Sequence, residues 1–526
     1  MSEINITDLT FCYDSSYDNI FEHVSFQIDT NWKLGFIGRN GKGKTTFLNL
    51  LLGKYEYTGR INTSIPFDYF PYFISDKMMD LDTIDIIEKI YPDYELWKIC
   101  RELDLLKVNS QVLYQKYRTL SHGERTKVML SILFSKNNHF LLIDEPTNHL
   151  DMETRDLLCH YLSLKQGFIL VSHDRQFIDK CVDHVLVLNR NSITVEKGNF
   201  SSWWDNKQKK DMFEEQQNKK LKREIGKLEE SAKNSAMWAD KVERSKIGFD
   251  STTEHDRFID SRAYIGEKSR RMQQRRKNLE RRQEKAIADK ENLLLDVENT
   301  VSLKIIPLSF QKEVYIRLKD FTVSYKNINE EEKKIVNNLT LEIKKEDRIL
   351  LKGINGSGKS SVIKSILSDE KITLLNTLPG ETINDNQIIG GLHEVAHGIR
   401  VSYISQDTSY LTGSLTQYID TNSLDATLFK AILRQLDFER IQFEKNLQDY
   451  SEGQKKKVLI ATSLSSQAHL YIWDEPLNYI DVFSRMQIED MILKFKPTML
   501  FVEHDKEFAD KITTNVIYLY LSFRKM

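Results

Sequence analysis

The stretch "GRNGKGKT", residues 38–45, decides the fold that we predict for this chain. An apolar run typical of a strand precedes it, and a pattern typical of a helix follows it. Its spacing fits the P-loop rule of Gly, four residues, Gly-Lys and then Ser or Thr. In such a loop the glycines turn backbone N–H groups toward phosphate oxygens at the positive end of a helix dipole. We therefore expect Lys44 to reach the β- and γ-phosphates of a nucleotide and Thr45 to hold Mg²⁺.

The same pattern returns in the second half of the chain as "GINGSGKS", residues 353–360, with Lys359 and Ser360 in the two roles. Three further motifs follow each P-loop in the same order. They are "LSHGE" (120–124), "FLLIDEPTNHLD" (140–151) and "LVSHD" (170–174) in the first copy, and "YSEGQ" (450–454), "LYIWDEPLNYID" (470–481) and "LFVEHD" (500–505) in the second. In both copies 23 residues separate the first serine from the strand-end aspartate, so the chain repeats one α/β unit.

Each copy contains an apolar strand that ends in Asp-Glu. The aspartate lies where it can bind Mg²⁺, and the glutamate is placed to polarise a water molecule against the γ-phosphate. A histidine that ends the next strand is placed to contact the γ-phosphate. These residues are Asp144, Glu145 and His173 in the first copy and Asp474, Glu475 and His504 in the second. A single Asp-Glu pair is more often a helix N-cap, and a single histidine is more often surface, but the ordered recurrence favours the functional interpretation.

The composition excludes several classes of protein. Charged residues are 29% and hydrophobic residues 40% of the 526 residues, as in ordinary soluble proteins, and the net charge of -2 predicts no overall affinity for nucleic acid. The apolar runs are too short to cross a bilayer, and the N-terminus lacks a secretion signal, so we expect a cytoplasmic protein. The cysteines form no C-x-x-C pair, so we expect reduced, buried thiols at Cys12, Cys100, Cys159 and Cys181.

Residues 203–302 separate the two copies and show a seven-residue apolar period on both sides of a loop at about 244–264. Two uninterrupted helices with this period predict an antiparallel helical hairpin. The second arm is basic, because residues 268–285 contain nine Lys or Arg and two Glu. This excess favours contact with a polyanion over a solvated surface, and the candidate RNA contacts are Arg270, Arg271, Arg275 and Arg276.

The loop of the hairpin has a different character. Residues 246–262 carry three basic and four acidic side chains, so the loop cannot gain affinity from phosphates. Its rings suit stacking on exposed bases, and the candidate tip residues are Phe249, His255, Phe258 and Tyr264. The alternative, in which these rings pack against the stem, stays open.

The ordered motifs resemble those of the ATP-binding cassette proteins, over about four-fifths of the chain. The resemblance implies that two cassettes close head-to-tail, so that each ATP lies between the P-loop of one and the signature serine and glycine of the other. One site then joins Lys44, Asp144, Glu145 and His173 to Ser451 and Gly453, and the other joins Lys359, Asp474, Glu475 and His504 to Ser121 and Gly123. It also implies that Tyr13 and Tyr325 stack on adenine, that Asp151 and Asp481 form the D-loops, and that the remaining ATP-binding residues are Gly38, Asn40, Gly41, Gly43, Thr46, Gly353, Asn355, Gly356, Gly358 and Ser361.

The chain departs from the family pattern in its first copy. The family glutamine that binds Mg²⁺ is present as Gln406 in the second copy, but Tyr72 takes its place in the first. A phenol lacks an amide oxygen, so we expect the first site to sense its nucleotide differently or to hydrolyse it more slowly. His122 and Glu452 replace the residue after the signature serine, a position whose side chain often faces away from the nucleotide.

The tandem copies, the hairpin and "EPTNHLD" resemble the ABC-F translation factors, and "WDEPLNYIDVFSRMQIE" is similar to their antibiotic-resistance branch, the Lsa/Vga-like or clostridial members. This resemblance implies an ATPase that binds the E site of the 70S ribosome and contacts 23S rRNA and P-site tRNA. It also implies protection against lincosamides, pleuromutilins and streptogramin A compounds. The alternatives are a housekeeping ABC-F factor and, less favoured, the ATPase subunit of a membrane exporter.

The predicted fold class is α/β, with two tandem P-loop cassette domains joined by a long antiparallel helical hairpin. The predicted boundaries are 1–202 for the first cassette, 203–302 for the linker and 303–526 for the second cassette. We expect ATP and Mg²⁺ as cofactors, no membrane contact, and a monomer away from the ribosome.

Overall fold

The computed structural model describes residues 3–13, 19–148, 150–189, 192–244, 271, 274, 277, 281–282, 303–326, 332–375 and 387–519. Contacts divide the chain into two compact units. The first unit comprises Met1–Trp203 and Val301–Met526, and the second comprises Trp204–Thr300. The first unit holds both copies of the repeated motifs; we call its part up to Trp203 cassette one and its part from Val301 cassette two.

The core of cassette one is a six-stranded sheet of β3 (Lys33–Ile37), β5 (Phe67–Phe70), β6 (Phe140–Asp144), β7 (Phe168–Val171), β8 (His184–Leu188) and β9 (Ile193–Lys197). Its strand order is β5-β6-β7-β3-β8-β9, and only the pair β8 and β9 is antiparallel. The central strands β6 and β7 are almost wholly buried, as expected for apolar runs in a sheet covered on both faces.

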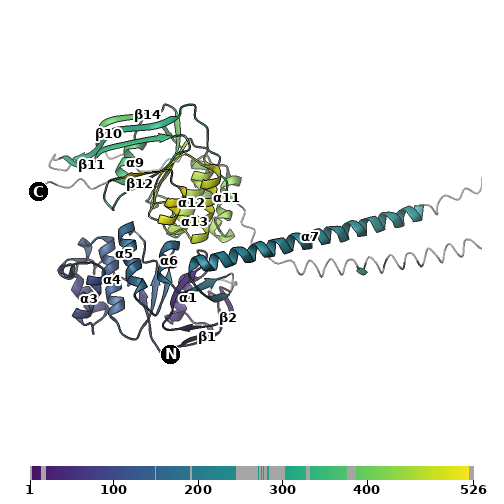
Figure 1. The fold of residues 1–526 in the computed structure, drawn as a ribbon, viewed down its shortest axis with the longest axis horizontal. Coiled ribbons are helices and arrows are strands. Elements are labelled where there is room, and N and C mark those ends of the chain that lie inside the picture. Colours follow the sequence, from purple (N-terminus) through teal and green to yellow (C-terminus); the bar gives the residue numbers. More distant parts are fainter. Residues whose placement is uncertain are drawn as a thin grey trace, which may run out of the picture. The chain divides into compact units, whose positions relative to one another are not determined.

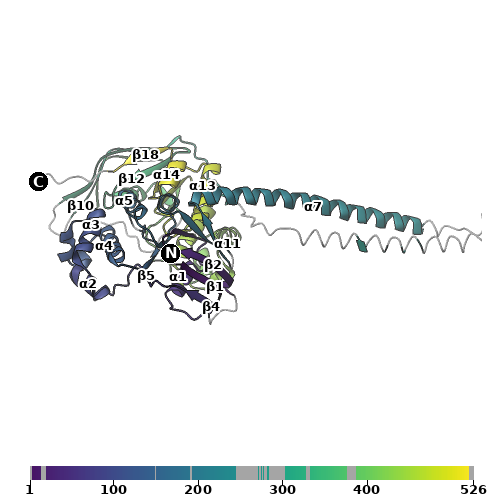
Figure 2. The same cartoon turned by 60° about the horizontal axis from the view of Figure 1, so that its bottom comes forward.

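A second, antiparallel sheet of cassette one consists of β1 (Glu3–Phe11), β2 (Phe21–Asp29) and β4 (Thr58–Asn62), in the order β2-β1-β4 (Figure 2). The helices of cassette one are α1 (Lys44–Leu51), α2 (Thr83–Ile90), α3 (Leu96–Leu105), α4 (His122–Ser135), α5 (Met152–Ser163) and α6 (Arg175–Cys181), with short 3₁₀ turns at Ser110–Tyr114 and Tyr117–Thr119.

One aromatic side chain fixes the helix that follows the first P-loop. The ring of Phe47 on α1 lies 6.0 Å from the ring of Phe21 and 5.4 Å from that of Phe36, measured between centroids. Phe21 belongs to β2 and Phe36 to β3, so Phe47 joins the small sheet to the large one. Ring pairs at these distances contribute about 1 kcal/mol each beyond the apolar area they bury. The beginning of α1 is therefore held rigidly at the end of β3.

Cassette two repeats this architecture (Figure 1). Its large sheet is parallel throughout, in the order β13-β15-β16-β17-β12-β18, and its small antiparallel sheet has the order β11-β10-β14. The strands are β10 (Val314–Lys326), β11 (Glu332–Lys344), β12 (Arg348–Lys352), β13 (Ile372–Leu374), β14 (Gln387–Val395), β15 (Ile399–Ile404), β16 (Leu470–Asp474), β17 (Met499–Val502) and β18 (Asn515–Tyr518). The helices are α9 (Lys359–Leu367), α10 (Leu415–Thr421), α11 (Ala426–Gln435), α12 (Glu452–Ser465), α13 (Val482–Phe495) and α14 (Lys506–Ile512), with 3₁₀ turns at Arg440–Glu444 and Leu447–Asp449.

Both P-loops lie between a strand and a helix, β3 and α1 in one cassette and β12 and α9 in the other. The prediction of an α/β fold with two tandem cassettes is therefore confirmed. The copies correspond residue by residue over their central motifs, because Asp144 and Asp474 end equivalent strands β6 and β16.

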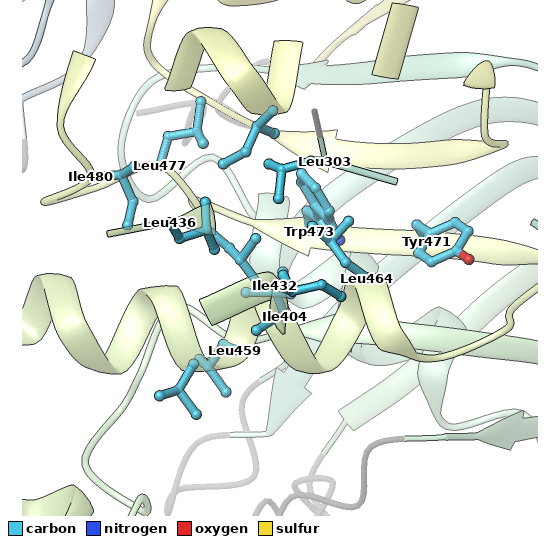
Figure 3. Packing of buried hydrophobic residues seen from close by; sticks show 14 of the residues in the cluster. Leu303, Ile404, Ile432, Leu436, Leu459, Leu464, Tyr471, Trp473, Leu477 and Ile480 are labelled. Carbon is cyan, nitrogen blue, oxygen red and sulfur yellow. The ribbon is translucent and has the colours of Figure 1, made fainter. Parts of the chain in front are cut away.

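The core of cassette two is packed around Trp473 (Figure 3). Trp473 is 1% exposed, and its indole Nε1 donates a hydrogen bond of 3.0 Å to Ser463 Oγ on α12. Leu303, which is also 1% exposed, belongs to the same cluster, so the chain enters this core directly after the linker. Removing a buried side chain of this size costs about 3–5 kcal/mol. This core holds β16, and with it Asp474 and Glu475, in place.

The linker unit contains α7 (Phe200–Arg244), a helix of 45 residues. The structure also describes Arg271, Gln274, Lys277, Arg281 and Arg282, which are helical and exposed. The predicted contacts Arg270, Arg275 and Arg276 and the predicted tip residues Phe249, His255, Phe258 and Tyr264 lie outside the described residues. The antiparallel hairpin therefore stays a prediction.

Among the described helices, none has the length and apolar character needed to cross a lipid bilayer. All four cysteines are free. Cys159 and Cys181 are buried as predicted, but the prediction is wrong for Cys12, which is exposed, and for Cys100, which is half-buried. Cys12 follows the end of β1, where the chain leaves the sheet and its side chains are no longer covered.

Candidate nucleotide sites

The first P-loop has the backbone geometry that its glycines permit. Gly41 and Gly43 have φ of 79° and 108°, in the left-handed region that favours glycine. A Cβ atom on Gly43 would also lie 2.6 Å from the Ile20 side chain. The equivalent residues of the second loop, Gly356 and Gly358, have φ of 81° and 95°. Each loop therefore directs its backbone toward the first turn of the following helix.

The P-loop lysines are held over their own loops. Lys44 Nζ donates to Gly38 O at 2.5 Å and to Asn40 Oδ1 at 3.2 Å. Lys359 Nζ donates to Gly353 O at 2.8 Å in the same way. Burial lowers the pKa of both ammonium groups. An ammonium that is held in place but poorly solvated is suited to bind phosphate oxygens, because it gives up few water contacts on doing so.

The residues predicted to hold Mg²⁺ come together in both cassettes. Thr45 Oγ1 donates to Asp144 Oδ2 at 3.2 Å, and Ser360 hydrogen-bonds Asp474. Asp474 Oδ1 is buried and, within the part of the chain that the structure describes, has no hydrogen-bond partner. Burial and the charge of Glu475 raise the pKa of Asp474 to about 6. A buried, unsatisfied carboxylate oxygen beside a hydroxyl is a donor set that fits Mg²⁺, which would supply charge stabilisation at the phosphates when bound.

The glutamate of cassette two is fixed by three side chains. Glu475 Oε2 accepts hydrogen bonds from Gln406 Nε2 at 2.9 Å and from Asn478 Nδ2 at 2.8 Å, and His504 Nε2 lies 3.2 Å from Glu475 Oε1. Burial alone would raise the pKa of Glu475, but the hydrogen bond and charge of His504, with Lys359, hold it at about 2. Glu475 is therefore an ionised, oriented carboxylate that can accept a proton from an attacking water.

The glutamate of cassette one is differently placed. Glu145 Oε1 lies 3.1 Å from His173 Nε2, but neither carboxylate oxygen has a hydrogen-bond partner among the described residues. Burial and the nearby Asp144 raise the pKa of Glu145 to about 8, and burial lowers the pKa of His173 well below its usual range. Glu145 and Glu475 share a left-handed backbone, with φ of 52° and 48°. Such backbone strain is typical of functional sites, and it occurs at the same position in both copies.

The two tyrosines expected at adenine make equivalent contacts. Tyr13 shares a hydrogen bond of 2.8 Å with Thr46 Oγ1, and Tyr325 OH donates to Ser361 Oγ at 3.2 Å. Thr46 and Ser361 occupy equivalent positions, two residues after the P-loop lysine and in the first turn of the following helix. Both rings are thus tethered beside the P-loop helix, which is compatible with the predicted stacking on adenine.

The signature serines begin helices. Ser121 is the N-cap of α4 and Ser451 is the N-cap of α12, and each forms a capping box. Gly123 and Gly453 lie in the first turns of these helices. The positive helix ends therefore present backbone N–H groups that suit an anionic γ-phosphate.

The first P-loop lies against the signature region of cassette two. Asn40 Nδ2 donates to Tyr479 O at 2.7 Å, and a Cβ atom on Gly453 would lie 2.7 Å from the same oxygen. Arg39 forms an ion pair with Asp437, and Lys42 Nζ lies 2.8 Å from Glu439 Oε1. These contacts bring Lys44 and Gly453 to one site, as the resemblance implies.

The second P-loop borders a cavity of about 480 Å³. From cassette two it is lined by Ile335, Asn355, Gly356, Gly358, Lys359, Ser360, Ser361, Gln406, Glu475, Asn478 and His504, and from cassette one by His122 and Arg155. His122 therefore faces the site, although its position in the sequence favoured a side chain that points away. The capping box does not explain this orientation, because Ser451 forms the same box; His122 borders the cavity because cassette one meets cassette two there. Glu452, its equivalent, accepts a hydrogen bond from Thr408 Oγ1 at 2.5 Å.

The D-loop aspartates are helix caps with different surroundings. Asp151 caps α5 by accepting from Thr154 N at 2.9 Å. Asp481 caps α13 by accepting from Ser484 N at 2.9 Å, is fully buried, and lies 3.1 Å from Lys457 Nζ. Lys457 holds the pKa of Asp481 below its usual value against the effect of burial.

We expect Asp481→Ala to destabilise the protein more than Asp151→Ala. Losing the cap costs about 1 kcal/mol in either case. In Asp481→Ala the buried Lys457 also loses its carboxylate partner and is left with the carbonyl oxygen of Leu436, and breaking a buried ion pair costs about 3–5 kcal/mol. Urea unfolding of the two variants gives the comparison, and equal shifts of the midpoint would contradict the assigned role of Lys457.

The sequence did not reveal several residues of these sites. Tyr69 OH donates to Asp144 Oδ2 at 3.1 Å. Arg175, directly after the motif that contains His173, pairs with Glu489 on α13. Arg175 has Lys506 as its equivalent, so comparison of the two copies gave no signal for it. Tyr69 has the tyrosine Tyr403 as its equivalent, a recurrence that could have marked it.

Comparison with known proteins agrees with this geometry. A family model described as ABC transporter matches residues 21–148 and 336–478. The ribosome protection protein VmlR of Bacillus subtilis (strain 168) is 25% identical, over 99% of this chain and 87% of that protein. The energy-dependent translational throttle protein EttA of Haemophilus influenzae is 23% identical, over 95% of this chain and 89% of that protein.

A solved structure of the archaeal ribosome recycling factor aABCE1, in complex with the ribosomal stalk protein aP1, superposes with a TM-score of 0.59 at 16% identity. The match covers 97% of this chain and 87% of that chain and shows a shared fold. The family model covers more than half of the chain, and both P-loops and both Asp-Glu strands lie within it. The chain therefore belongs to the ABC transporter family of ATP-binding cassette ATPases, and within it to the ABC-F group.

Proposed function

We propose that this ATPase binds the ribosome when both of its sites hold ATP, and that it protects the ribosome from antibiotics that act at the peptidyl-transferase centre. The observation that carries the proposal is a complete pair of nucleotide sites in one chain, with the 45-residue helix α7 between them. The proposal is also supported by the similarity to VmlR, a ribosome protection protein, which extends over 99% of this chain.

The sites suggest how ATP governs binding. Each nucleotide is bound by a P-loop of one cassette and a signature helix of the other, so ATP links the two cassettes through its γ-phosphate. Hydrolysis, with Glu475 as the base, removes that link. On this proposal the linked form occupies the E site as a monomer and directs the linker tip (Phe249, His255, Phe258 and Tyr264) toward P-site tRNA and the drug.

The second arm of the linker supports contact with RNA. Arg271, Lys277, Arg281 and Arg282 are exposed on helical segments within the described residues. Exposed cations attract the phosphates of 23S rRNA, and such binding weakens as salt rises. The predicted contacts Arg270, Arg275 and Arg276 extend this basic set.

We expect the double variant Glu145→Gln/Glu475→Gln to co-sediment with 70S ribosomes in ATP. It keeps the P-loops and so still binds ATP, but it lacks both bases and stays in the linked form. The control is Lys44→Ala/Lys359→Ala, which loses both phosphate-binding lysines and should remain in the supernatant. If the double glutamine variant also remains there at low salt, the ribosome is not its partner.

The likeness to EttA favours a second candidate, a translation factor that acts on the ribosome without a drug phenotype. Expression in a susceptible host separates the two functions. Raised inhibitory concentrations of lincosamides or pleuromutilins support protection, provided that the Lys44→Ala/Lys359→Ala variant gives no such increase. If the inhibitory concentrations are unchanged and the protein still binds ribosomes, the function is that of a translation factor without a drug phenotype.

A further inference from the structure

Strand pairing shows which residues of the two cassettes are equivalent beside the nucleotide. In cassette one, Tyr69 on β5 lies opposite Leu142 on β6. In cassette two, Tyr403 on β15 lies opposite Ile472 on β16. Leu142 and Ile472 each lie two residues before the strand-end aspartate. Tyr69 therefore corresponds to Tyr403, and Tyr72 corresponds to Gln406, by three-dimensional register and not only by sequence spacing.

Tyr72 turns away from the nucleotide site of cassette one. Its hydroxyl donates to Asp68 Oδ2 at 2.7 Å. Lys136 Nζ lies 2.6 Å from the same Asp68 oxygen and 5.0 Å from the centroid of the Tyr72 ring. The side chains of Asp68 and Lys136 are only 13% and 11% exposed. Tyr72, Asp68 and Lys136 thus form a closed cluster between β5 and the end of α4, whereas Gln406 donates directly to Glu475.

Tyr69, and not Tyr72, contacts the acidic pair of cassette one. Its hydroxyl donates to Asp144 Oδ2 at 3.1 Å, the same oxygen that accepts from Thr45 Oγ1 at 3.2 Å. Its ring packs against the core of cassette one, and Lys54 Nζ lies 5.3 Å from the ring centroid. The ring is therefore held in place, and the hydroxyl is directed at the aspartate that we assign to Mg²⁺.

In cassette two, the equivalent Tyr403 is 3% exposed and belongs to the apolar core cluster. Gln406 contacts the acidic pair of cassette two through Glu475 Oε2, to which its Nε2 donates at 2.9 Å. Tyr69 thus contacts the aspartate of cassette one, whereas Gln406 contacts the glutamate of cassette two.

We infer that Tyr69 is a positioning residue that orients Asp144 toward Mg²⁺ in the first site, and that Tyr72 is a structural residue without a part in nucleotide binding. The first site therefore has an additional side chain that orients its metal ligand, while the second has additional side chains that orient its base. The inference rests on the ATP sites alone and is independent of any ribosome partner.

The physical basis is the control of a metal ligand by its own hydrogen bond. A carboxylate with one oriented donor loses rotational freedom and presents its remaining lone pairs in one direction. Partners of this kind typically change metal affinity by about 10- to 100-fold when they are removed. Tyr69→Phe removes the hydroxyl and retains the ring, so the packing against the core is preserved.

The test is a fluorescence titration of the full chain with a fluorescent ATP analogue, in the Lys359→Ala background, so that only the first site binds. Nucleotide affinity is measured over a range of Mg²⁺ concentrations and also in EDTA. Mg²⁺ should increase the affinity for the nucleotide, and half of this increase is reached at a certain Mg²⁺ concentration. For Tyr69→Phe we expect that concentration to rise about 10-fold. The affinity in EDTA should stay unchanged, because the P-loop contacts remain.

Tyr72→Phe is the matched control, since it removes one phenolic hydroxyl three residues away. It should leave the Mg²⁺ dependence unchanged and lower the melting temperature, because Asp68 loses a buried donor. The inference is overturned if Tyr69→Phe leaves the Mg²⁺ dependence unchanged, or if it lowers affinity equally with and without Mg²⁺. It is also overturned if Tyr72→Phe shifts the Mg²⁺ dependence as much as Tyr69→Phe.

Discussion

Replacing Glu475 with glutamine is expected to reduce steady-state ATP turnover about 100-fold or more, whereas Glu145→Gln should leave most of the turnover intact. A positioned general base contributes about 10²- to 10⁴-fold to a rate. Glu475 meets this condition, because Gln406, Asn478 and His504 all contact its carboxylate. The carboxylate of Glu145 lies 3.1 Å from His173 Nε2 but, among the described residues, receives no side-chain amide donors like those that Gln406 and Asn478 provide to Glu475.

The measurement is the rate of phosphate release from each purified single variant at saturating ATP. The control is nucleotide affinity, which should stay close to that of the unaltered protein in both variants because the P-loops are untouched. An equal loss of turnover in the two variants would show that the asymmetry between the sites has no kinetic consequence.

The second large effect is expected at a charge cluster between the two cassettes. Arg175, the first residue of α6, is 3% exposed and pairs with Glu489 on α13. Its guanidinium also lies 3.5 Å from Glu507, and Lys511 Nζ lies 2.9 Å from both Glu489 and Glu507. Arg175→Met leaves two acidic groups with only one cation, so we expect a loss of about 3–5 kcal/mol in the free energy of unfolding.

Urea unfolding in saturating ATP measures this loss, and a double-mutant cycle with Glu489→Gln assigns it. The double variant should be less destabilised than the sum of the two single variants, because the pair is removed together. Lys506→Met is the matched control: Lys506 occupies the equivalent position after His504 and is exposed, so its removal should change stability by less than about 0.5 kcal/mol. Additive single effects would show that Arg175 and Glu489 are not coupled.

Local sequence patterns were sufficient to predict the P-loops. The glycine spacing at 38–45 and 353–360 predicted the strand-loop-helix units, because glycine adopts the positive φ of Gly41 and Gly356 without the strain that a side chain would cause. The strand-end Asp144 and Asp474 were predicted for a similar reason: a short apolar run followed by Asp-Glu is a local signal. Their pairing with Thr45 and Ser360 depends on the sheet order, in which only β7 lies between β6 and β3 and only β17 lies between β16 and β12.

Contacts between segments far apart in the sequence were not predictable in this way. Tyr69 and Tyr72 look equally able to enter the first site, and only the pairing of β5 with β6 shows that Tyr69 reaches Asp144 while Tyr72 bonds Asp68. His122 faces the second P-loop because of the way in which the two cassettes contact each other. No periodicity in the chain encodes such a contact.

The sequence by itself therefore determined the family, the two-cassette α/β fold and the residues that touch phosphate, because these depend on backbone conformations that a few residue types impose locally. The sequence predicted from Tyr72 that the first site differs from the second, but only the tertiary structure decided which contacts make the two sites unequal. Gln406 and Asn478 hydrogen-bond Glu475, whereas Glu145 has no such donor, and this difference arises from side chains on separate strands and loops. The pKa of each carboxylate depends on burial and on its neighbours in space, which the order of residues along the chain does not specify.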